Sequence, residues 1–535
     1  MRGNFENISR LVRLILRRER IMSAVWVVIL LLFSVGLAPV LGTLFDEASR
    51  AAYAETLNNP AMVAMMGPVY GIGNYTAGAM YSNAMLLWMI ITIGIMNIFL
   101  VVRHTRADEE KGRTEIVRSL PTGRLANLSA TMITAIVVNG ALALLTGLGV
   151  AAMGIESMDF NGSMLYGAVL GVSGLFFAAV AALFAQLSSS SRGAIGLSVV
   201  ALGVIYVMRA AGDLSSEALS LISPMGLIQR TQIYVENHWW PVFVLLIEAA
   251  VVIAAAYALN AVRDMGQGFI HAKPGRKEAS SMLRSPFGLA YRLSRNMIIA
   301  WTVGMFILGA SYGAILDGID EFVASNEFYQ QLIGSHPDFT LAQMFVSMVA
   351  AIMALIALAS VLITIMKPRS EEKDGYTESV LARAVSRGKY LSGYAVLAFA
   401  GSVLVQCAIA IGLYMSAVAV LPDPGDLTLG YLLKANLVYV PAMWVMIGVA
   451  VLLIGLAPKA TSAIWGYYGF TFFAFFIGRI PNLLPDWLEK ITPFGYVPQL
   501  PVDSVNYATL TALVVIAVAL TIGGIVFYRK RDLVA

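Results

Sequence analysis

The sequence predicts an all-α polytopic membrane protein with 12 transmembrane helices, arranged as two parallel six-helix repeats. The chain of 535 residues is 59% hydrophobic and only 13% charged, and its mean hydropathy is +0.76. A soluble globular domain carries about 25% charged residues, so this composition indicates a protein built for lipid. Two further observations support the prediction: apolar runs of spanning length, and matching segments in the two halves of the chain.

Runs of about 20 apolar residues are long enough to cross the hydrocarbon core of a bilayer. Twelve such runs occur, at residues 22–44, 79–102, 128–153, 163–187, 193–211, 238–262, 297–316, 342–366, 390–420, 432–456, 461–479 and 507–528. The first run follows arginines, as a secretory signal does. This run is longer than the apolar core of a secretory signal, however, and the residues that flank it recur around 297–316. We therefore expect it to remain in the protein as a transmembrane span.

Positive charges distinguish the two sets of loops between these runs. Only six of the 36 Lys and Arg residues lie in one set of loops or within the spans, namely Arg50, Arg209, Arg230, Lys434, Arg479 and Lys490. The other set includes both termini, so the positive-inside rule predicts that both termini are cytoplasmic. Basic clusters of this kind suit anionic lipid headgroups, and we expect no nucleic-acid partner.

Matching segments recur in the same order in both halves of the chain. The pairs are Arg17, Arg20 and Trp26 with Arg292, Arg295 and Trp301; RADEEKGRTE at 106–115 with RSEEKDGYTE at 369–378; Arg124 with Arg387; Ser-Pro-Met-Gly at 223–226 with Thr-Pro-Phe-Gly at 492–495; and Arg263-Asp264 with Arg531-Asp532. We therefore predict a first repeat at 1–264, a cytoplasmic linker at 265–285 and a second repeat at 286–535. An even number of spans gives both repeats one orientation, and a pathway is expected at their interface.

Each repeat opens with a basic amphipathic segment. In residues 4–20, Phe5, Ile8, Val12 and Ile15 recur at roughly helical spacing among several arginines. We expect this helix to lie in the membrane interface with its apolar stripe toward the lipid.

The repeated decapeptide joins the second and third spans of each repeat. We expect each copy to form one short helix, capped at its start by Thr105 or Ser370. A small apolar face follows in each copy, formed by Ile116, Val117 and Leu120 and by Val380, Leu381 and Val385. A solvated connector is one interpretation. Acidic residues near a helix start beside an apolar face also suit docking onto another protein, and the repetition favours docking.

Polar residues within the spans are candidates for a substrate pathway, namely Glu248, Arg209, Asn97, Asn139 and Gln406. Glu248 lies in the sixth run, where a carboxylate is a functional-site candidate; the alternative is an interior glutamate that Arg209 reaches. Asn97, Asn139 and Gln406 either line the pathway or bridge helices. The loop at 45–78 is expected to cap the outer mouth, either as a gate or as a packed lid.

The sequence contains no motif for nucleotide binding or for metal binding. It contains no G-x-x-x-x-G-K-[ST] phosphate loop, and none of its four His residues has a metal-ligand spacing. Cys407 is the single cysteine and lies within a span. We therefore expect no catalytic residue, no metal and no cofactor on this chain, so energy for transport would come from an ion gradient or from another subunit.

The repeated pattern R-x-[DE]-E-x-x-G-x-T-E resembles the coupling helix of the permeases of ABC-2 type exporters. S/T-P-x-G before the last span of each repeat and Gly-Leu-Ala-Pro at 455–458 are also similar to that family. The duplicated twelve-span form resembles the permeases of polyketide and ionophore antibiotic exporters of the tetronasin type, over nearly the whole chain. The second copy departs from the first at Lys373-Asp374, where the first has Glu110-Lys111.

The resemblance implies a transport subunit that is not itself an enzyme, in a bacterial plasma membrane. Two copies of a separate ABC ATPase would bind ATP and Mg²⁺ and push on this chain, and the cargo would be hydrophobic or amphipathic. The expected ATPase contacts are Arg106, Asp108, Glu109, Gly112, Thr114, Glu115, Arg369, Glu371, Glu372, Gly375, Thr377 and Glu378. The main alternative is an ion-coupled secondary drug transporter with two six-helix halves; a membrane enzyme or a sensor is a third.

Overall fold

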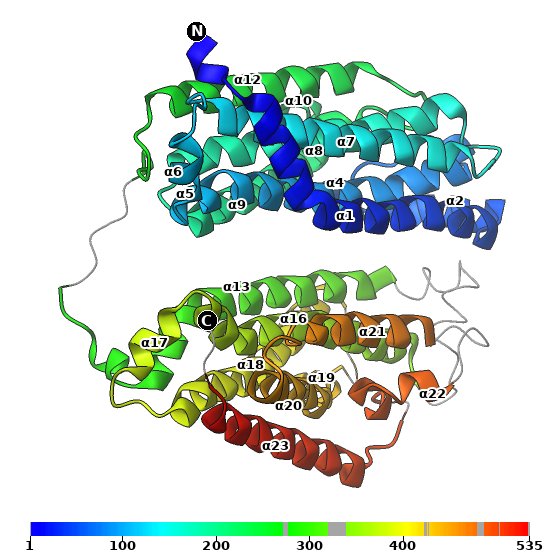
Figure 1. The fold of residues 1–535 in the computed structure, drawn as a ribbon. Helices are drawn as coiled ribbons and strands as arrows, with labels where there is room; N and C mark the ends of the chain where they lie inside the picture. The colour runs from blue at the N-terminus through cyan, green and yellow to red at the C-terminus, as the bar shows by residue number, and fades with distance from the viewer. Residues whose placement is uncertain are drawn as a thin grey trace. The chain divides into compact units, whose positions relative to one another are not determined.

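The computed structural model describes residues 2–270, 277–318, 339–421, 425, 427–478, 486–501 and 503–532. The chain divides into two compact units, Met1–Pro274 and Gly275–Ala535 (Figure 1). The division falls within the predicted linker at 265–285, of which residues 271–276 lie outside the described part. Every regular element in the described residues is a helix, and one isolated bridge pairs Ser188 with Ile270.

Six long helices form the body of the first unit. They are α1 (Ile8–Leu44), α4 (Ala77–His104), α7 (Ala126–Ala151), α8 (Phe160–Leu187), α9 (Ser191–Ser215) and α12 (Trp240–Val262). Shorter elements connect them: η1 (Arg2–Phe5), α2 (Glu47–Leu57), α3 (Pro60–Met66), η2 (Ile72–Asn74), α5 (Arg106–Glu110), α6 (Arg113–Arg118), α10 (Glu217–Ile222) and α11 (Pro224–Gln229). Helix α8 packs against α4, α7 and α12. Gly167 permits its close approach to α7, because a Cβ there would lie 2.2 Å from the Ala143 carbonyl oxygen.

The second unit also has six principal helices. They are α13 (Pro286–Gly313), α16 (Leu341–Lys373), α18 (Arg387–Val420), α20 (Val440–Leu456), α21 (Ala463–Gly478) and α23 (Tyr507–Lys530). The shorter elements are η3 (Ser281–Arg284), η4 (Ala314–Gly318), α17 (Tyr376–Leu381), α19 (Leu429–Leu437), α22 (Asp486–Glu489) and η5 (Pro493–Tyr496). Helix α20 packs against α16, α18 and α23, which occupy the same places in the chain order of this unit as α4, α7 and α12 do in the first.

Eleven helices among the described residues are long and apolar enough to cross a membrane. The predicted span at 461–479 corresponds to α21, which has 16 described residues and is not among the eleven. The predicted span at 432–456 is interrupted, since α19 ends at Leu437 and α20 begins at Val440. Pro441 explains this break, because proline has no N–H to donate to the preceding turn and is tolerated only at a helix start.

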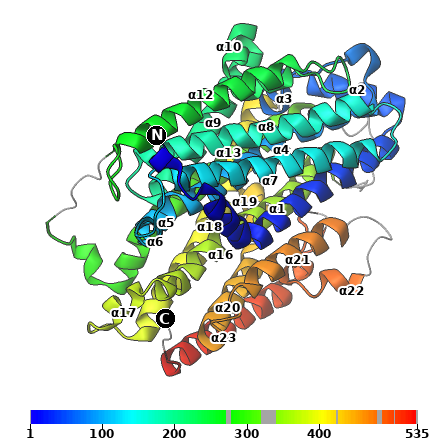
Figure 2. The ribbon, with the colours of Figure 1, turned by 45° about the horizontal axis from the view of Figure 1, so that its top comes forward.

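The predicted amphipathic segment and the first span form one helix, α1, of 37 residues. Its ribbon changes direction part-way along (Figures 1 and 2). Leu11 and Ile15, on the amphipathic part, are buried in a cluster with Ala126 and Ala130 at the start of α7. Part of the apolar stripe therefore packs on protein, whereas the prediction placed it toward lipid.

The helices at the edge of the first unit expose large apolar side chains. On α12, Phe243, Ile247 and Val251 are exposed, whereas most of α8 is buried. An exposed apolar face of this length is stable in contact with lipid chains, so the burial pattern fits a helix bundle within a bilayer.

Candidate functional site

Each copy of the decapeptide changes direction at its glycine. Gly112 has φ 70° and Gly375 has φ 77°, the left-handed region that glycine adopts without strain. The prediction of one short helix per copy is therefore wrong: Gly112 separates α5 from α6, and Gly375 separates α16 from α17. Thr105 does not cap α5, since its hydroxyl donates to the Val101 carbonyl at 2.7 Å. Ser370 lies inside α16.

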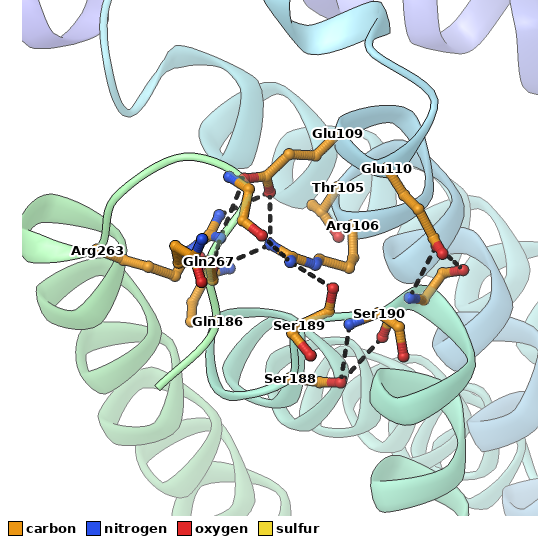
Figure 3. Close-up of polar contacts among 12 residues, drawn as sticks. Thr105, Arg106, Glu109, Glu110, Gln186, Ser188, Ser189, Ser190, Arg263 and Gln267 are labelled. Atoms are coloured by element: carbon orange, nitrogen blue, oxygen red, sulfur yellow. Dashed lines mark hydrogen bonds and ion pairs between the residues drawn. The ribbon is translucent and has the colours of Figure 1, made fainter. Parts of the chain in front are cut away.

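In the first unit, Glu109 of α5 is paired with Arg263, which directly follows α12 (Figure 3). Both terminal nitrogens of the Arg263 guanidinium donate to the Glu109 carboxylate, at 3.0 and 2.7 Å. The Gly266 N–H donates to the same carboxylate at 2.6 Å, and Arg106 lies 3.2 Å from it. A two-pronged ion pair of this kind fixes orientation as well as position.

Arg106 connects α5 to two other segments (Figure 3). Only 2% of this residue is exposed. Its guanidinium donates to the carbonyl oxygens of Ser189, just before α9, and of Gly266 and Gln267, after α12, at 2.6, 2.8 and 3.2 Å. The two terminal nitrogens of this buried cation are thus satisfied by one carboxylate and three carbonyls. Helix α5 is thereby held to the start of α9 and to the end of α12.

The second unit repeats this arrangement. Arg531, directly after α23, donates to the Glu372 carboxylate at 2.9 and 2.5 Å, and Arg369 lies 3.3 Å from the same carboxylate. Arg369 also donates to the Pro458 carbonyl at 3.0 Å.

A third arginine completes each arrangement. Arg124 donates to the Arg263 carbonyl at 2.8 Å, and Arg387 donates to the Arg531 carbonyl at 2.5 Å. We call each set of four the arginine–glutamate clamp. The two clamps consist of Arg106, Glu109, Arg124 and Arg263, and of Arg369, Glu372, Arg387 and Arg531.

The clamp changes the expected roles of the acidic residues. Glu109 and Glu372 were expected to contact a partner, but their carboxylates are occupied within their own units. Glu115 and Glu378 are exposed, and neither has an ion pair with any described residue. Thr114 and Thr377 are buried. Among the acidic residues expected to contact the ATPase, those that are exposed and have no ion pair within the described residues are Glu115 of α6 and Glu378 of α17.

The first unit has ion pairs that tie α1 to α5. Asp108 accepts from Arg18 at 2.6 and 3.0 Å and from Arg113 at 3.0 Å. Glu19 accepts from Arg103 at 2.8 Å and lies 2.7 Å from the His104 ring. The positions matching Arg18 and Glu19 in the second unit hold Leu293 and Ser294, so this network belongs to the first unit.

Two further acidic residues of the decapeptides also differ between the copies. Glu110 accepts from the Ser191 backbone N–H and hydroxyl at 3.1 and 2.5 Å, at the start of α9. Its counterpart is Lys373, the last residue of α16. Glu371, which matches Asp108, is half-buried. The departure noted in the sequence therefore changes how each connector is attached.

The apolar faces of the two copies are unequal as well. In the first unit Ile116 and Leu120 are 69% and 60% exposed. In the second unit Val380, Leu381 and Val385 pack against the hydrophobic core, and Tyr376 is exposed instead.

The polar residues of the spans mostly bridge helices. Asn97 of α4 and Asn139 of α7 exchange two hydrogen bonds, at 3.0 and 2.7 Å, and are fully buried. Gln406 of α18 donates to the Met443 sulfur of α20 at 3.3 Å. Glu248 is half-buried on α12, and its Oε2 atom has no hydrogen-bond partner among the described residues.

Arg209 of α9 pairs with its own helix and with α3, not with Glu248. Its guanidinium forms an ion pair with Asp213 at 3.1 Å and donates to the Val63 and Ala64 carbonyls of α3 at 3.2 and 2.6 Å. It therefore does not serve as the partner of Glu248. An Arg-x-x-x-Asp pair within an apolar run was the sequence signal for this contact, since residues four apart meet on a helix.

Further contacts hold the segment around α3 in place. The Tyr206 hydroxyl donates to the Met65 carbonyl at 2.7 Å, and Gln229 donates to the Met66 carbonyl at 3.1 Å. The last carbonyls of α3 are thus satisfied by side chains of α9 and α11. The loop at 45–78, predicted as an outer cap, contains α2 and α3 and is packed against the first unit in this structure.

The long apolar helices and internally satisfied polar groups define a multi-pass helical membrane protein. A family model described as multidrug efflux system permease Rv1217c, C-terminal domain, matches residues 8–259 and 283–529. The chain is also 32% identical, over 544 residues, to the multidrug efflux system permease protein Rv1217c of Mycobacterium tuberculosis (strain ATCC 25618 / H37Rv). That match covers 99% of this chain and 96% of the relative. The chain therefore belongs to the Rv1217c family of multidrug efflux permeases, which are membrane transporters.

Proposed function

We propose that this chain is the permease subunit of an ABC-2 type exporter in a bacterial plasma membrane. It moves hydrophobic or amphipathic compounds, including drugs and antibiotics, out of the cell. Two copies of a separate ATPase subunit bind ATP and Mg²⁺ and supply the energy. The name of the Mycobacterium tuberculosis relative supports drug efflux, and the resemblance to tetronasin-type exporters favours polyketide and ionophore antibiotics as cargo.

The repetition of the arginine–glutamate clamp carries the proposal of ATP coupling. In each unit, the clamp attaches the connector after the second span to the end of the last helix, through Glu109 and Arg263 or Glu372 and Arg531. A solvated connector needs no such attachment. A segment that receives a push does, because ion pairs with two hydrogen bonds resist both displacement and rotation.

The surface offered to the ATPase lies beyond the clamp, on α6 and α17. It contains Glu115 in the first unit and Glu378 in the second, both exposed. Ile116 and Leu120 add apolar area beside Glu115, and Tyr376 does so beside Glu378. A partner groove with basic and apolar side chains would complement this surface, in the manner of a helix docked in a groove.

The test is assembly with the separate ATPase subunit that this proposal requires. The variants are Glu115→Ala, Glu378→Ala and the double variant, and the matched control is Glu278→Ala, an exposed acidic residue of the linker. Removing one partner of a charge pair that is buried in an interface costs on the order of 2–5 kcal/mol, so we expect recovery of the complex to fall about tenfold or more in the double variant. Recovery and export equal to the control would refute the assignment.

One observation favours the alternative of ion-coupled transport. The Oε2 atom of Glu248 is buried and has no hydrogen-bond partner among the described residues, and such a carboxylate within a span can carry a proton. The deciding experiment uses membrane vesicles that contain this chain, with or without ATP and the ATPase. Export that needs only a proton gradient, and that Glu248→Gln abolishes, would establish the alternative; export that needs ATP supports the proposal above.

A further inference from the structure

A cavity of about 30 Å³ lies beside α6, the start of α7 and the ends of α8 and α12. Its charged lining consists of four arginines and one carboxylate: Arg106, Arg118, Arg124, Arg263 and Glu109. The cavity shares residues with the arginine–glutamate clamp of the first unit, but the clamp does not use Arg118.

The positive charge of this cavity is not balanced. Glu109 is already paired with Arg106 and Arg263. Arg118 donates to the Arg124 carbonyl at 3.3 Å, and Arg124 donates to the Arg263 carbonyl at 2.8 Å. Neither Arg118 nor Arg124 has a carboxylate partner within the described ranges. Burial and the charge of Arg124 lower the pKa of Arg118, as expected for a cation beside a cation.

Two buried hydrogen-bond donors that line the cavity have no hydrogen-bond partner among the described residues. Thr114 is 8% exposed, and its hydroxyl has no hydrogen bond to any described residue. The Nε atom of Arg106 likewise has none. Buried polar groups are nearly always satisfied by protein, water or a ligand, so these donors indicate a polar occupant that accepts hydrogen bonds.

The second unit keeps the clamp and Thr377, which matches Thr114, but it replaces three other polar side chains of this cavity. At the offsets of the repeat, Leu381 stands where the first unit has Arg118, Tyr390 where it has Asn127, and Tyr528 where it has Asn260. Tyr390 and Tyr528 are buried. The excess of cations is therefore a property of the first unit, although the clamp itself is present in both.

We propose that this cavity binds the phosphate group of an anionic ligand, with Arg118 and Arg124 as charged ligands and the Thr114 hydroxyl as a donor. Arginine binds phosphate oxygens through paired N–H groups. The volume admits about one or two oxygens, so the remainder of the ligand lies at the mouth. The same chemistry fits the headgroup of an anionic lipid, since the charge distribution predicts a cytoplasmic position for this loop, and it also fits free phosphate.

The experiment compares Arg118→Leu and Thr114→Val with Arg383→Leu in the full chain. Arg383 is an exposed arginine of the corresponding loop in the second unit, two positions after the counterpart of Arg118, so the control removes the same charge from that loop. Size-exclusion chromatography first checks that each variant is folded. One arm counts phosphatidylglycerol retained on the purified protein by native mass spectrometry, with phosphatidylcholine as comparison. The other arm measures thermal stabilisation by inorganic phosphate against chloride at equal ionic strength.

We expect Arg118→Leu to weaken phosphate-group binding about tenfold, the loss typical of one charge-assisted hydrogen bond, and Thr114→Val to weaken it less. Loss of retained phosphatidylglycerol alone identifies a lipid headgroup as the source, and loss of stabilisation by phosphate alone identifies a soluble anion. If Arg118→Leu and Arg383→Leu behave alike in both arms, the site does not exist. Assembly with an ATPase is not measured in either arm, so this outcome leaves the proposed function unaffected.

Discussion

The carboxylate of Glu109 accepts hydrogen bonds from both terminal nitrogens of Arg263, at 3.0 and 2.7 Å, across 154 positions of sequence. Glu372 and Arg531 form the same pair across 159 positions. In each unit this pair joins the connector after the second long helix to the end of the last one. The connector is thereby part of the folded unit, and Glu115 of α6 and Glu378 of α17 remain exposed beyond the pair.

Breaking one clamp should destabilise its unit. Glu109→Ala leaves the buried Arg106 and the nearly buried Arg263 without a carboxylate, and removing one partner of a buried pair costs on the order of 3–5 kcal/mol. The midpoint of thermal unfolding, measured on the purified chain in detergent, should fall by several degrees. Glu115→Ala, which removes an exposed carboxylate, should change stability by less than about 0.5 kcal/mol.

A charge exchange offers a check on this prediction. The double variant Glu109→Arg with Arg263→Glu keeps the opposite charges of the pair, so it should recover part of the stability that each single variant loses. Additive losses in the double variant would show that the two side chains do not interact.

Arg209 should anchor the segment around α3. Arg209→Met leaves the buried Asp213 carboxylate unpaired and frees two carbonyls of α3. We expect a loss on the order of 3–5 kcal/mol and faster proteolysis within residues 58–68. Arg230→Met is the matched control, because its partner Glu217 is exposed and exposed pairs contribute about 0–1 kcal/mol. Equal effects of the two variants would contradict the anchoring role.

The Asn97–Asn139 pair should show coupling between α4 and α7. Either residue changed to Leu leaves the other amide unsatisfied in the core, whereas the double change removes both. Interhelical hydrogen bonds in membranes contribute about 0.6 kcal/mol on average and up to about 1.7 kcal/mol. A double-mutant cycle on the free energy of unfolding should therefore give a coupling within this range, and a coupling of zero would count against the pair.

Topology is testable with an impermeant thiol reagent. In a Cys407→Ala background, Lys111→Cys should be protected in intact cells and labelled after permeabilisation, because the charge distribution predicts that this loop is cytoplasmic. Ser215→Cys, at the exposed opposite end of α9, should be labelled in intact cells. The reverse pattern would invert the orientation of the chain.

The long helices were predictable because the bilayer sets their length and composition. The runs at 128–153 and 163–187 correspond to α7, Ala126–Ala151, and α8, Phe160–Leu187. The interruption before α20 was less visible, because the residues around Val438 and Tyr439 are as apolar as their neighbours and only Pro441 marks the break. Hydropathy indicates that a segment lies in an apolar environment, but it does not indicate where the backbone of a helix is interrupted.

The sequence marked the residues of the clamps as matching positions but did not predict their pairings. Arg124 and Arg263 recur with Glu109 and Glu115 in the repeat, yet of these four only the two glutamates were among the expected ATPase contacts. The repetition did not separate Glu109, which is paired internally, from Glu115, which is exposed. That difference arises from the direction of the chain at Gly112 and from the position of Arg263 after α12, and both depend on tertiary packing.

The two connectors join their long helices differently. Helix α16 continues for 33 residues from Leu341 to Lys373, about 50 Å at the rise of an α-helix. Pro368 lies inside it and removes one backbone hydrogen bond, but the helix is not divided there. In the first unit Thr105, with φ −112° and ψ −89°, separates α4 from α5. A push on α17 would therefore reach α16 through one helix, whereas a push on α6 would reach α4 across a break, and a transporter built from similar repeats would move asymmetrically.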